Sequence, residues 1–292
     1  MTLPLRNGVA PSFVILPAGC GGTLIDFLTQ HFPAIPRSVW EDRLARGEVV
    51  DERGRAMQPD TACRQNAKIF YYRELPPETP IPFEETILHV DAHLLAVDKP
   101  HFLPVTPSGR FLQETLLVRL RRKTGLADLS PIHRLDRETA GVMLFSVNPA
   151  SRGLYQSLFQ QRVVSKVYEA LAYPLPGVEF PLTYRSRMVD GTPFFRMQEV
   201  PGVPNSETVI TPVESRGALV LYRLEPLTGR KHQLRLHMAS LGIPIINDGF
   251  YPQALPCKAD DVSSPLKLLS RSLCFTDPLT GEERHFVSRL TL

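Results

Sequence analysis

Asp136 lies between two arginines, Arg134 and Arg137, in the segment PIHRLDRETAG at residues 131–141. A nearby cation stabilises a carboxylate, so both arginines should favour the ionised form of Asp136. An ionised aspartate suits a nucleophile or a group that stabilises developing positive charge. A structural ion pair at a strand entrance is the ordinary alternative, because an apolar stretch follows at 142–147. The residue types therefore indicate a reactive carboxylate only if other groups converge on it.

A second group of charged side chains lies in the segment LTGRKHQLRLHMA at residues 227–239. Further basic residues occur in RLRRK at 119–123, and the formal net charge of the chain is +3. Basic clusters that share a face attract the phosphates of nucleic acid. The cluster at 119–123 taken alone is equally typical of a solvated helix face. The charge distribution thus leans towards a polyanionic partner without requiring one.

The segment HRLD at 133–136, followed by Thr139, Gly141 and an apolar stretch, resembles the active-site signature of the RluA-type pseudouridine synthases. The segment at 227–239 resembles the basic motif of the same family. Two long motifs in the family's order make a specific signal. The resemblance extends over residues 83–290 and more loosely over 12–75. It implies an enzyme that isomerises specific uridines in structured rRNA or tRNA to pseudouridine, with no cofactor and no metal.

The resemblance also implies roles for three central residues. Asp136 would act on a flipped-out uridine by attacking C1′, attacking the base or removing a 2′ proton, and each route needs it ionised and positioned. Tyr168, in SKVYEA at 165–170, matches the family's active-site tyrosine, which can stack on the extruded uracil and help to move a proton. Arg235 matches the basic residue that pairs with the catalytic aspartate and could hold it bidentately.

Contacts to RNA would come from the residues around these three. Arg134 would fill the place left by the flipped base or contact a phosphate. For His133, a hydrogen-bonded structural role is the simpler alternative. The candidate substrate-binding residues are His133, Arg134, Arg137, Gly229, Arg230, Lys231 and His232.

Two other functions fit parts of the sequence. A metal-dependent hydrolase could use His133, His232, His237 and Asp248, but the four residues between His232 and His237 differ from the spacing of helical zinc sites. An Asp-Gly turn also explains Asp248. A non-catalytic RNA-binding protein could keep the synthase fold as a scaffold, although an aspartate that faces phosphates would weaken its binding.

The sequence departs from the family pattern at two places. Ala140 stands where the family commonly has serine, which removes one hydroxyl beside the active loop. Ser270-Arg271 stands near a position where the family often has His-Ala. Neither departure touches the three central residues, so activity is expected while the RNA target stays open.

The length of 292 residues allows one substantial core and a small accessory domain. Cys20, Cys63, Cys257 and Cys274 are far apart, which favours reduced thiols over a disulfide framework or a zinc site. No apolar run approaches the ~18 residues of a membrane span, and residues 1–9 lack the pattern of a signal peptide. We therefore expect a cytoplasmic protein with no membrane association and no obligatory protein partner.

The prolines at 76, 77, 80 and 82 predict an extended linker at 76–83, which would separate a small unit at 1–75 from a catalytic domain at 84–292. In the small unit we predict helices at 23–31 and 36–46, Gly47 as a helix cap, and strands at 48–51 and 69–72. This pattern resembles the alpha-L RNA-binding module attached to many synthases of the family. The charges of this unit are balanced, so a structural cap is an equal alternative.

The catalytic domain should be α+β, because many strands and few helices occur without a regular βαβ order. Such a pattern favours a mixed, mostly antiparallel β-sheet. Strands are predicted at 87–90, 94–97, 142–147, 165–173, 183–189, 208–213, 218–224, 266–275 and 285–290, and helices at 149–162 and 231–241. Asp136 would then precede one strand, Tyr168 would lie on another, and Arg235 would lie on a helix.

Overall fold

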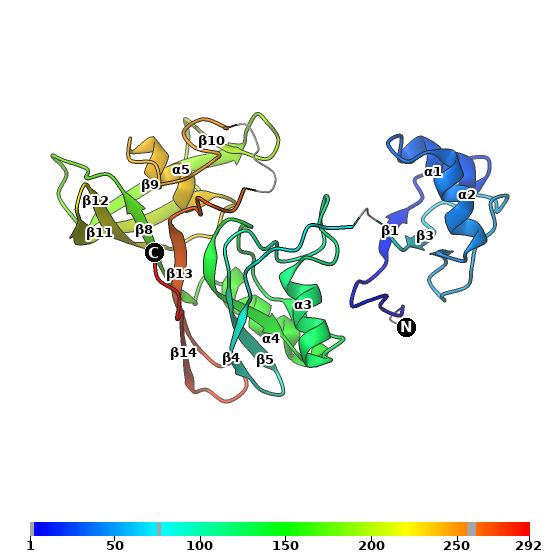
Figure 1. Cartoon of the computed structure of the whole chain (residues 1–292), viewed down its shortest axis with the longest axis horizontal. Coiled ribbons are helices and arrows are strands. Elements are labelled where there is room, and N and C mark those ends of the chain that lie inside the picture. The colour runs from blue at the N-terminus through cyan, green and yellow to red at the C-terminus, as the bar shows by residue number, and fades with distance from the viewer. Residues whose placement is uncertain (1–2, 75–76, 256–260) are drawn as a thin grey trace.

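The computed structural model describes residues 3–74, 77–255 and 261–292 (Figure 1). A small N-terminal unit and a larger unit each have a hydrophobic core of their own. The elements of the N-terminal unit are β1 (Ser12–Ile15), α1 (Leu24–His31), α2 (Arg37–Ala45), β2 (Val49–Val50) and β3 (Lys68–Tyr71). Its strands form an antiparallel sheet in the order β1-β3-β2.

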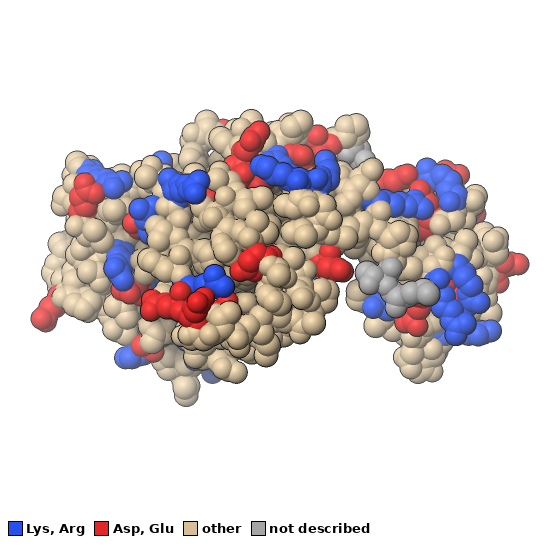
Figure 2. Space-filling model, turned by 90° about the horizontal axis from the view of Figure 1, so that it is seen from below, with Lys and Arg blue, Asp and Glu red and all other residues tan. Residues whose placement is uncertain are grey.

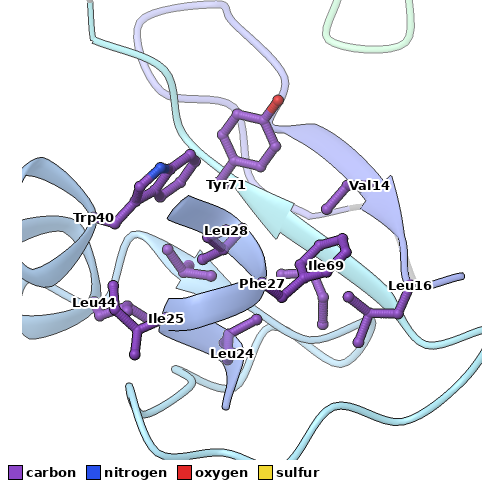
Figure 3. Packing of buried hydrophobic residues seen from close by; sticks show 11 residues of the cluster. Val14, Leu16, Leu24, Ile25, Phe27, Leu28, Trp40, Leu44, Ile69 and Tyr71 are labelled. Atoms are coloured by element: carbon purple, nitrogen blue, oxygen red, sulfur yellow. The ribbon is translucent and has the colours of Figure 1, made fainter. Parts of the chain in front are cut away.

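The N-terminal unit is held together by apolar side chains from both helices and the sheet (Figure 3). Trp40 of α2 is fully buried, and its ring meets the edge of Tyr71 with centroids 5.3 Å apart. At the start of α1 the Thr23 side chain accepts a hydrogen bond from the backbone N–H of Asp26, as an N-cap does. Gly47 follows α2 with a φ of 67°, which confirms the predicted helix end. The predicted helices and strands of this unit are confirmed, and β1 was missed.

The larger unit is built on one sheet of eleven strands over the described residues. The strand order is β10-β9-β11-β12-β8-β13-β7-β5-β4, with β14 beside β13 and β6 beside β7. The elements are β4 (Thr86–Val90), β5 (Leu94–Lys99), α3 (Leu116–Thr124), β6 (Ser130–Pro131), β7 (Ala140–Ser146), α4 (Pro149–Gln160), β8 (Ser165–Ala172), β9 (Leu182–Asp190), β10 (Met197–Val200), β11 (Ser206–Arg216), β12 (Leu219–Pro226), α5 (Gln233–Ser240), β13 (Leu268–Thr276) and β14 (Glu283–Val287). The strands pair antiparallel except for the parallel pair β7–β13, so the predicted mixed, mostly antiparallel sheet is confirmed.

Strand β7 is buried on both faces because helices cover both sides of this part of the sheet. Met143 and Phe145 join the core that includes α3, whereas Val142 and Leu144 join the core that includes Tyr155 of α4. Alternate residues of a strand point to opposite faces, so a continuous apolar run fits a strand covered on both sides. The loop that carries Asp136 is therefore followed along the chain by a strand that is buried on both faces.

The parallel pair β7–β13 depends on a glycine. Gly141 lies opposite Ser270 and has a φ of 107°. A Cβ at this position would lie 2.2 Å from the Ser270 carbonyl oxygen. Ala140 lies opposite Leu269 in the same register, so the departures at Ala140 and Ser270 occur at one place in the sheet, behind the Asp136 loop.

The two units touch through backbone and apolar contacts. The Arg73 guanidinium donates to the Gly109 carbonyl oxygen at 2.7 Å, and Arg121 of α3 donates to the Gly8 carbonyl oxygen at 3.1 Å. Val9 packs with Leu112 and Val118. These contacts attach residues 8–9 and residue 73 to the larger unit.

The described part of the predicted linker, residues 77–83, is irregular and contacts the larger unit. Residues 77–83 contain no helix or strand. The Glu78 carboxylate accepts backbone hydrogen bonds from Leu112, Gln113 and Glu114, and Ile81 is buried. The predicted boundary at 75/76 lies outside the described residues. Over its described part, the segment is therefore fastened to the larger unit and is no free spacer.

None of the helices in the described ranges is long and apolar enough to span a membrane.

Replacing Gly141 by alanine should cost on the order of 3 kcal/mol or more of the free energy of unfolding, because the new Cβ would collide with backbone and φ is unfavourable. Gly217→Ala is the matched control, since Gly217 has a φ of 65° and nothing within 4 Å of the added Cβ. That control should lose only about 1 kcal/mol. Urea unfolding followed by circular dichroism measures both, and equal losses would contradict the steric argument.

Candidate active site

The loop that carries Asp136 connects β6 to β7 and is fixed by a buried lysine. The Thr139 backbone N–H donates to the Asp136 carbonyl oxygen, which closes a turn around the carboxylate. Lys99, at the end of β5, is fully buried and donates to the carbonyl oxygens of Pro100, Leu103 and Arg137 at 2.9 Å each. Burial lowers the pKa of the Lys99 amine to about 7. Lys99 thus positions the Asp136 loop through the backbone of its neighbour Arg137.

Arg235 of α5 is bound by Asp248 in a buried, two-pronged ion pair. The Arg235 Nε and Nη2 atoms donate to the two Asp248 carboxylate oxygens at 2.8 and 2.6 Å. Both side chains are 1% exposed. Burial alone would lower the pKa of Arg235, but the hydrogen bonds and charge of Asp248, together with the charges of Asp136 and Glu138, raise it above the ordinary value. Arg235 therefore carries a permanent positive charge in an enclosed site.

The third nitrogen of Arg235 faces the predicted nucleophile. Nη1 lies 3.6 Å from an Asp136 oxygen and 3.7 Å from a Glu138 oxygen. It is buried and has no hydrogen-bond partner among the described residues. The predicted pairing of Arg235 with Asp136 is present as an ion pair. The predicted bidentate grip is wrong, because Asp248 occupies that side of the guanidinium.

Two further cations were predicted to flank Asp136, and only one does. Arg134 lies 3.9 Å from an Asp136 oxygen, and its side chain is 65% exposed. Arg137 instead donates from Nε to the Phe102 carbonyl oxygen and lies over the Phe111 ring. The positive side of Asp136 is therefore made by Arg235 from another element, with Arg134 at the rim.

Tyr168 of β8 lies beside Asp136, as predicted. The burial of its phenol raises its pKa to about 12, a hydrogen bond to Ser270 opposes the shift, and the charge of Asp136 adds to it. Ser270 and Tyr168 are paired across β13 and β8. The serine at the departure position therefore lies directly opposite the predicted active-site tyrosine on the neighbouring strand.

The histidines of the two motifs have separate partners and do not converge. His133 Nε2 accepts from the Leu144 backbone N–H, and its ring stacks on Phe159. His232 lies next to the Tyr251 hydroxyl, with Nε2 3.8 Å from an Asp136 oxygen. His237 contacts the hydroxyls of Ser186, Ser206 and Thr208. Among the described residues no group of three histidine, cysteine, aspartate or glutamate side chains could hold a metal ion, so the hydrolase alternative lacks its ligand set.

Two hollows meet at Asp136. The first, of about 480 Å³, is lined by Asp136, Tyr168, Arg235 and Thr139, and by Arg134, Arg162, Lys166 and Arg230. The second, of about 680 Å³, lies on the other side of the loop and is lined by Arg137, Lys231, Phe111, Phe195 and Phe250. His133, Arg134, Leu135, Asp136 and His232 line both. Gly229 also lines the first hollow, so every predicted substrate-binding residue lies on one hollow or both.

The basic segment at 119–123 is not part of this site. Arg119 pairs with Glu114 and Glu85, and Arg121 donates to backbone carbonyl groups. In the N-terminal unit, Arg37 and Arg46 are likewise paired with nearby carboxylates. Figure 2 shows basic and acidic patches side by side on both units. The cations that line the hollows are those of the two motifs together with Arg110, Arg162 and Lys166.

The sequence patterns did not assign several of the residues that position the site. Lys99 ends the apolar run LLAVDKP, and a charge at the end of a buried strand was the available signal. Glu138 follows the Asp136 motif directly but carried no pattern of its own. Asp248 was explained by its turn, and it does accept the backbone N–H groups of Phe250 and Tyr251. Its ion pair with Arg235 joins segments too far apart for sequence spacing to show.

The three histidines of the two motifs should make the protein less stable in mild acid. Burial lowers the pKa of His133, His232 and His237 to about 4 from an ordinary 6.5. The unfolded chain takes up these protons below about pH 6.5 and the folded protein only near pH 4, so the free energy of unfolding falls as pH falls through this window. His237, which is fully buried, should contribute about 2 kcal/mol of the fall between pH 7 and pH 5.

Urea unfolding at pH 7, 6 and 5 checks this. His237→Gln should reduce the change with pH, whatever it does to stability at pH 7. His285→Gln, at an exposed position, is the control and should keep the change of the unsubstituted protein. An unaltered pH dependence in His237→Gln would contradict the assignment.

Comparison with known proteins agrees with this geometry. A family model described as RNA pseudouridylate synthase matches residues 93–240, which is half of the chain. The chain is 31% identical over 211 residues to the dual-specificity RNA pseudouridine synthase RluA of Pasteurella multocida, covering 67% of this chain and 89% of that protein. It is 27% identical over 242 residues to an uncharacterized RNA pseudouridine synthase of Synechocystis, covering 80% and 81%.

A solved structure shares the fold. The human RNA pseudouridylate synthase domain containing 4 protein superposes with a TM-score of 0.54 at 28% identity, covering 70% of this chain and 88% of the other. The family-model match at 93–240 includes Asp136, Tyr168 and Arg235. The chain belongs to the RluA-type RNA pseudouridine synthases, which are isomerases.

Proposed function

We propose that this enzyme converts specific uridines of structured rRNA or tRNA to pseudouridine, with Asp136 as the nucleophile on a flipped-out uridine. One observation carries the proposal. The Asp136 carboxylate lies where two hollows meet, 3.6 Å from the only Arg235 nitrogen that Asp248 does not occupy. A charge pair held in an enclosed site is the arrangement that stabilises an ionic intermediate or transition state.

The reaction breaks the C1′–N1 bond of the nucleotide, turns the uracil and joins C5 to C1′, and the C5 proton leaves to solvent. The first hollow has the volume of a ligand pocket, and a uracil bound in it would lie against Tyr168 and Arg235, which line it. In each of the three routes, attack on C1′, attack on the base or removal of the 2′ proton, Asp136 acts as an anion that Arg235 holds in place. Tyr168 supplies a ring for stacking and a high-pKa hydroxyl that stays protonated at neutral pH.

The cations around the first hollow suit the phosphates of the target strand. Arg134 and Arg230 are exposed at its rim, and Lys166 lies deeper. Extrusion of a nucleotide costs a few kcal/mol and needs compensating contacts, which Arg134 would provide beside the vacated position. The names of the relatives support rRNA or tRNA as substrate, since one is a dual-specificity RNA pseudouridine synthase and another is a mitochondrial tRNA pseudouridine(32) synthase of Saccharomyces cerevisiae.

The N-terminal unit would act as an alpha-L-type RNA-binding module. Its two helices followed by β2 and β3 have the expected order, and β1 adds a third strand before them. Its ion-paired arginines support the alternative of a structural cap equally well. The cytoplasmic location stays a prediction.

Asp136→Asn should abolish tritium release from RNA labelled at uridine C5, because the amide keeps the shape of the side chain and loses its charge. RNA binding should be unchanged within a factor of about three, since the substitution removes no phosphate contact. Asp128→Asn, at an exposed position outside both hollows, is the matched control and should retain full activity. If the unsubstituted protein binds cellular rRNA and tRNA but releases no tritium from either, it is a non-catalytic RNA-binding protein.

Arg235→Lys should slow single-turnover isomerisation by at least about 10-fold with little loss of RNA affinity, because one ammonium group cannot hold Asp248 bidentately and also face Asp136. Arg223→Lys is the control, since Arg223 pairs with Glu225 on the surface of β12. Rates are measured with saturating enzyme and affinities by filter binding. Loss of affinity without a change in the rate would assign Arg235 to RNA binding instead.

A further inference from the structure

The second hollow has a feature that the reaction itself does not use. Phe194, between β9 and β10, is 86% exposed, more than any other large apolar residue described. Single exposed apolar residues are common, but this one directly precedes a residue that lines a cavity. Its neighbour Phe195 lines the second hollow, and the two rings are 5.7 Å apart at an interplanar angle of 81°.

Aromatic rings connect Phe194 with the catalytic carboxylate. The Phe195 ring lies 5.1 Å from that of Phe250, and Phe250 lies 5.5 Å from the His232 ring. His232 Nε2 is 3.8 Å from Asp136. The rings come from three separate segments, so their succession is a property of the fold. They form a wall that leads from solvent to Asp136.

The turn that carries Phe194 is fastened on both sides. Lys231 donates from its amine to the Phe194 carbonyl oxygen at 3.3 Å. Arg196 donates to the Pro252 carbonyl oxygen at 2.7 Å, and its guanidinium lies over the Tyr251 ring. A backbone held in place before binding leaves only the rotation of the side chain to be lost when a ligand stacks on the ring. The exposure of Phe194 is thus combined with a fixed backbone.

The cations of the second hollow together with its aromatic rings favour a nucleotide over an acidic peptide, which has no base to stack, or an apolar partner, which has no negative charge. Its cations are Arg110, Arg134, Arg137 and Lys231, and its carboxylates are Asp136 and Glu138. Flat aromatic faces next to cations are the combination that single-stranded nucleic acid uses, with bases on the rings and phosphates on the cations. A strand whose uridine enters the first hollow must continue past Asp136, which the two hollows share.

We propose that the edge of the second hollow is a subsite for a nucleotide next to the target uridine, with its base stacked on Phe194 just outside the hollow and the ring of Phe195, which lines the hollow, supporting it. The proposal rests on the proposed function for the position of the target uridine. Phe194 is then a residue that binds substrate and helps to choose the target by the base beside it. Stacking on a ring accepts every base but favours the larger purines, so the subsite selects a neighbour by stacking strength.

The test compares Phe194→Ala and Phe194→Leu with the unsubstituted protein. The probes are a short fluorescein-labelled single-stranded RNA with one central uridine and the same RNA with abasic nucleotides on both sides of that uridine. Phe194→Ala should bind the intact RNA roughly 5- to 100-fold more weakly and the abasic RNA with unchanged affinity. Phe194→Leu should behave like Phe194→Ala, since leucine keeps an apolar side chain but has no aromatic face.

Tyr173→Ala is the matched control. Tyr173 is an aromatic residue that is 56% exposed and lines neither hollow. Its removal should leave both affinities unchanged. Because Phe194 is exposed, the variant proteins should fold normally. Circular dichroism spectra of the variants are the check of their folding.

Phe194→Trp gives a direct signal. The single native tryptophan, Trp40, is fully buried in the N-terminal unit and supplies a constant background. Stacking of a base should quench the added indole when the intact RNA binds, and the abasic RNA should quench it less. Equal quenching by both RNAs, or full affinity in Phe194→Leu, would overturn the stacking subsite.

Activity separates this inference from the proposed function. If the unsubstituted protein releases tritium and all Phe194 variants bind the intact RNA with the same affinity as the unsubstituted protein, the subsite is contradicted and the isomerase is supported. Absence of tritium release by the unsubstituted protein, together with an affinity loss of the Phe194 variants that is confined to the intact RNA, would contradict the isomerase and support the subsite.

Discussion

The buried ion pair between Arg235 and Asp248 is the interaction on which the site depends. A guanidinium taken out of water needs full compensation, and two short hydrogen bonds to one carboxylate provide much of it. Asp248 also accepts two backbone N–H groups, so the same carboxylate fixes the turn that holds Phe250 under the guanidinium at 4.6 Å. With Nε and Nη2 occupied, the orientation of Nη1 is set, and it faces Asp136.

The large sheet converts this local pair into a three-residue site. Strand β13 lies between β7 and β8, so the loop before β7 and the middle of β8 meet at one place. The parallel pairing of Gly141 with Ser270 brings β7 close to β13, and the Ser270 hydroxyl donates to the Val142 carbonyl oxygen of β7. On its other side, Ser270 pairs with Tyr168 of β8. Helix α5 packs on the core of β8 and β12 through Leu234 and Met238. Arg235, the residue after Leu234, faces the Asp136 loop. Each side chain is thus oriented by an element whose own position is determined by packing.

Much of this could be predicted from the sequence, because it depends on local patterns. The period-two strands, the helix that starts at Pro149 and the motif order identified the fold class and the members of the site. Strand bounds shifted by a few residues where pairing partners extend a strand, as in β11, which is longer than its apolar core at 208–213. The short strands β1, β6 and β10 were missed since tertiary pairing, not composition, makes them strands. The partner of Arg235 could not be predicted for the same reason, and the charge of Lys99 at the end of an apolar run could mark the residue but not the distant Arg137 carbonyl group that it contacts.

The hydrogen bond from Arg73 to the Gly109 carbonyl oxygen links the two units thermodynamically. Gly109 belongs to the wall of the second hollow, and Arg73 follows the last strand of the N-terminal unit. A ligand that binds the N-terminal unit and favours one position of Arg73 therefore biases the geometry of that wall, and by reciprocity a ligand in the hollow biases the N-terminal unit equally.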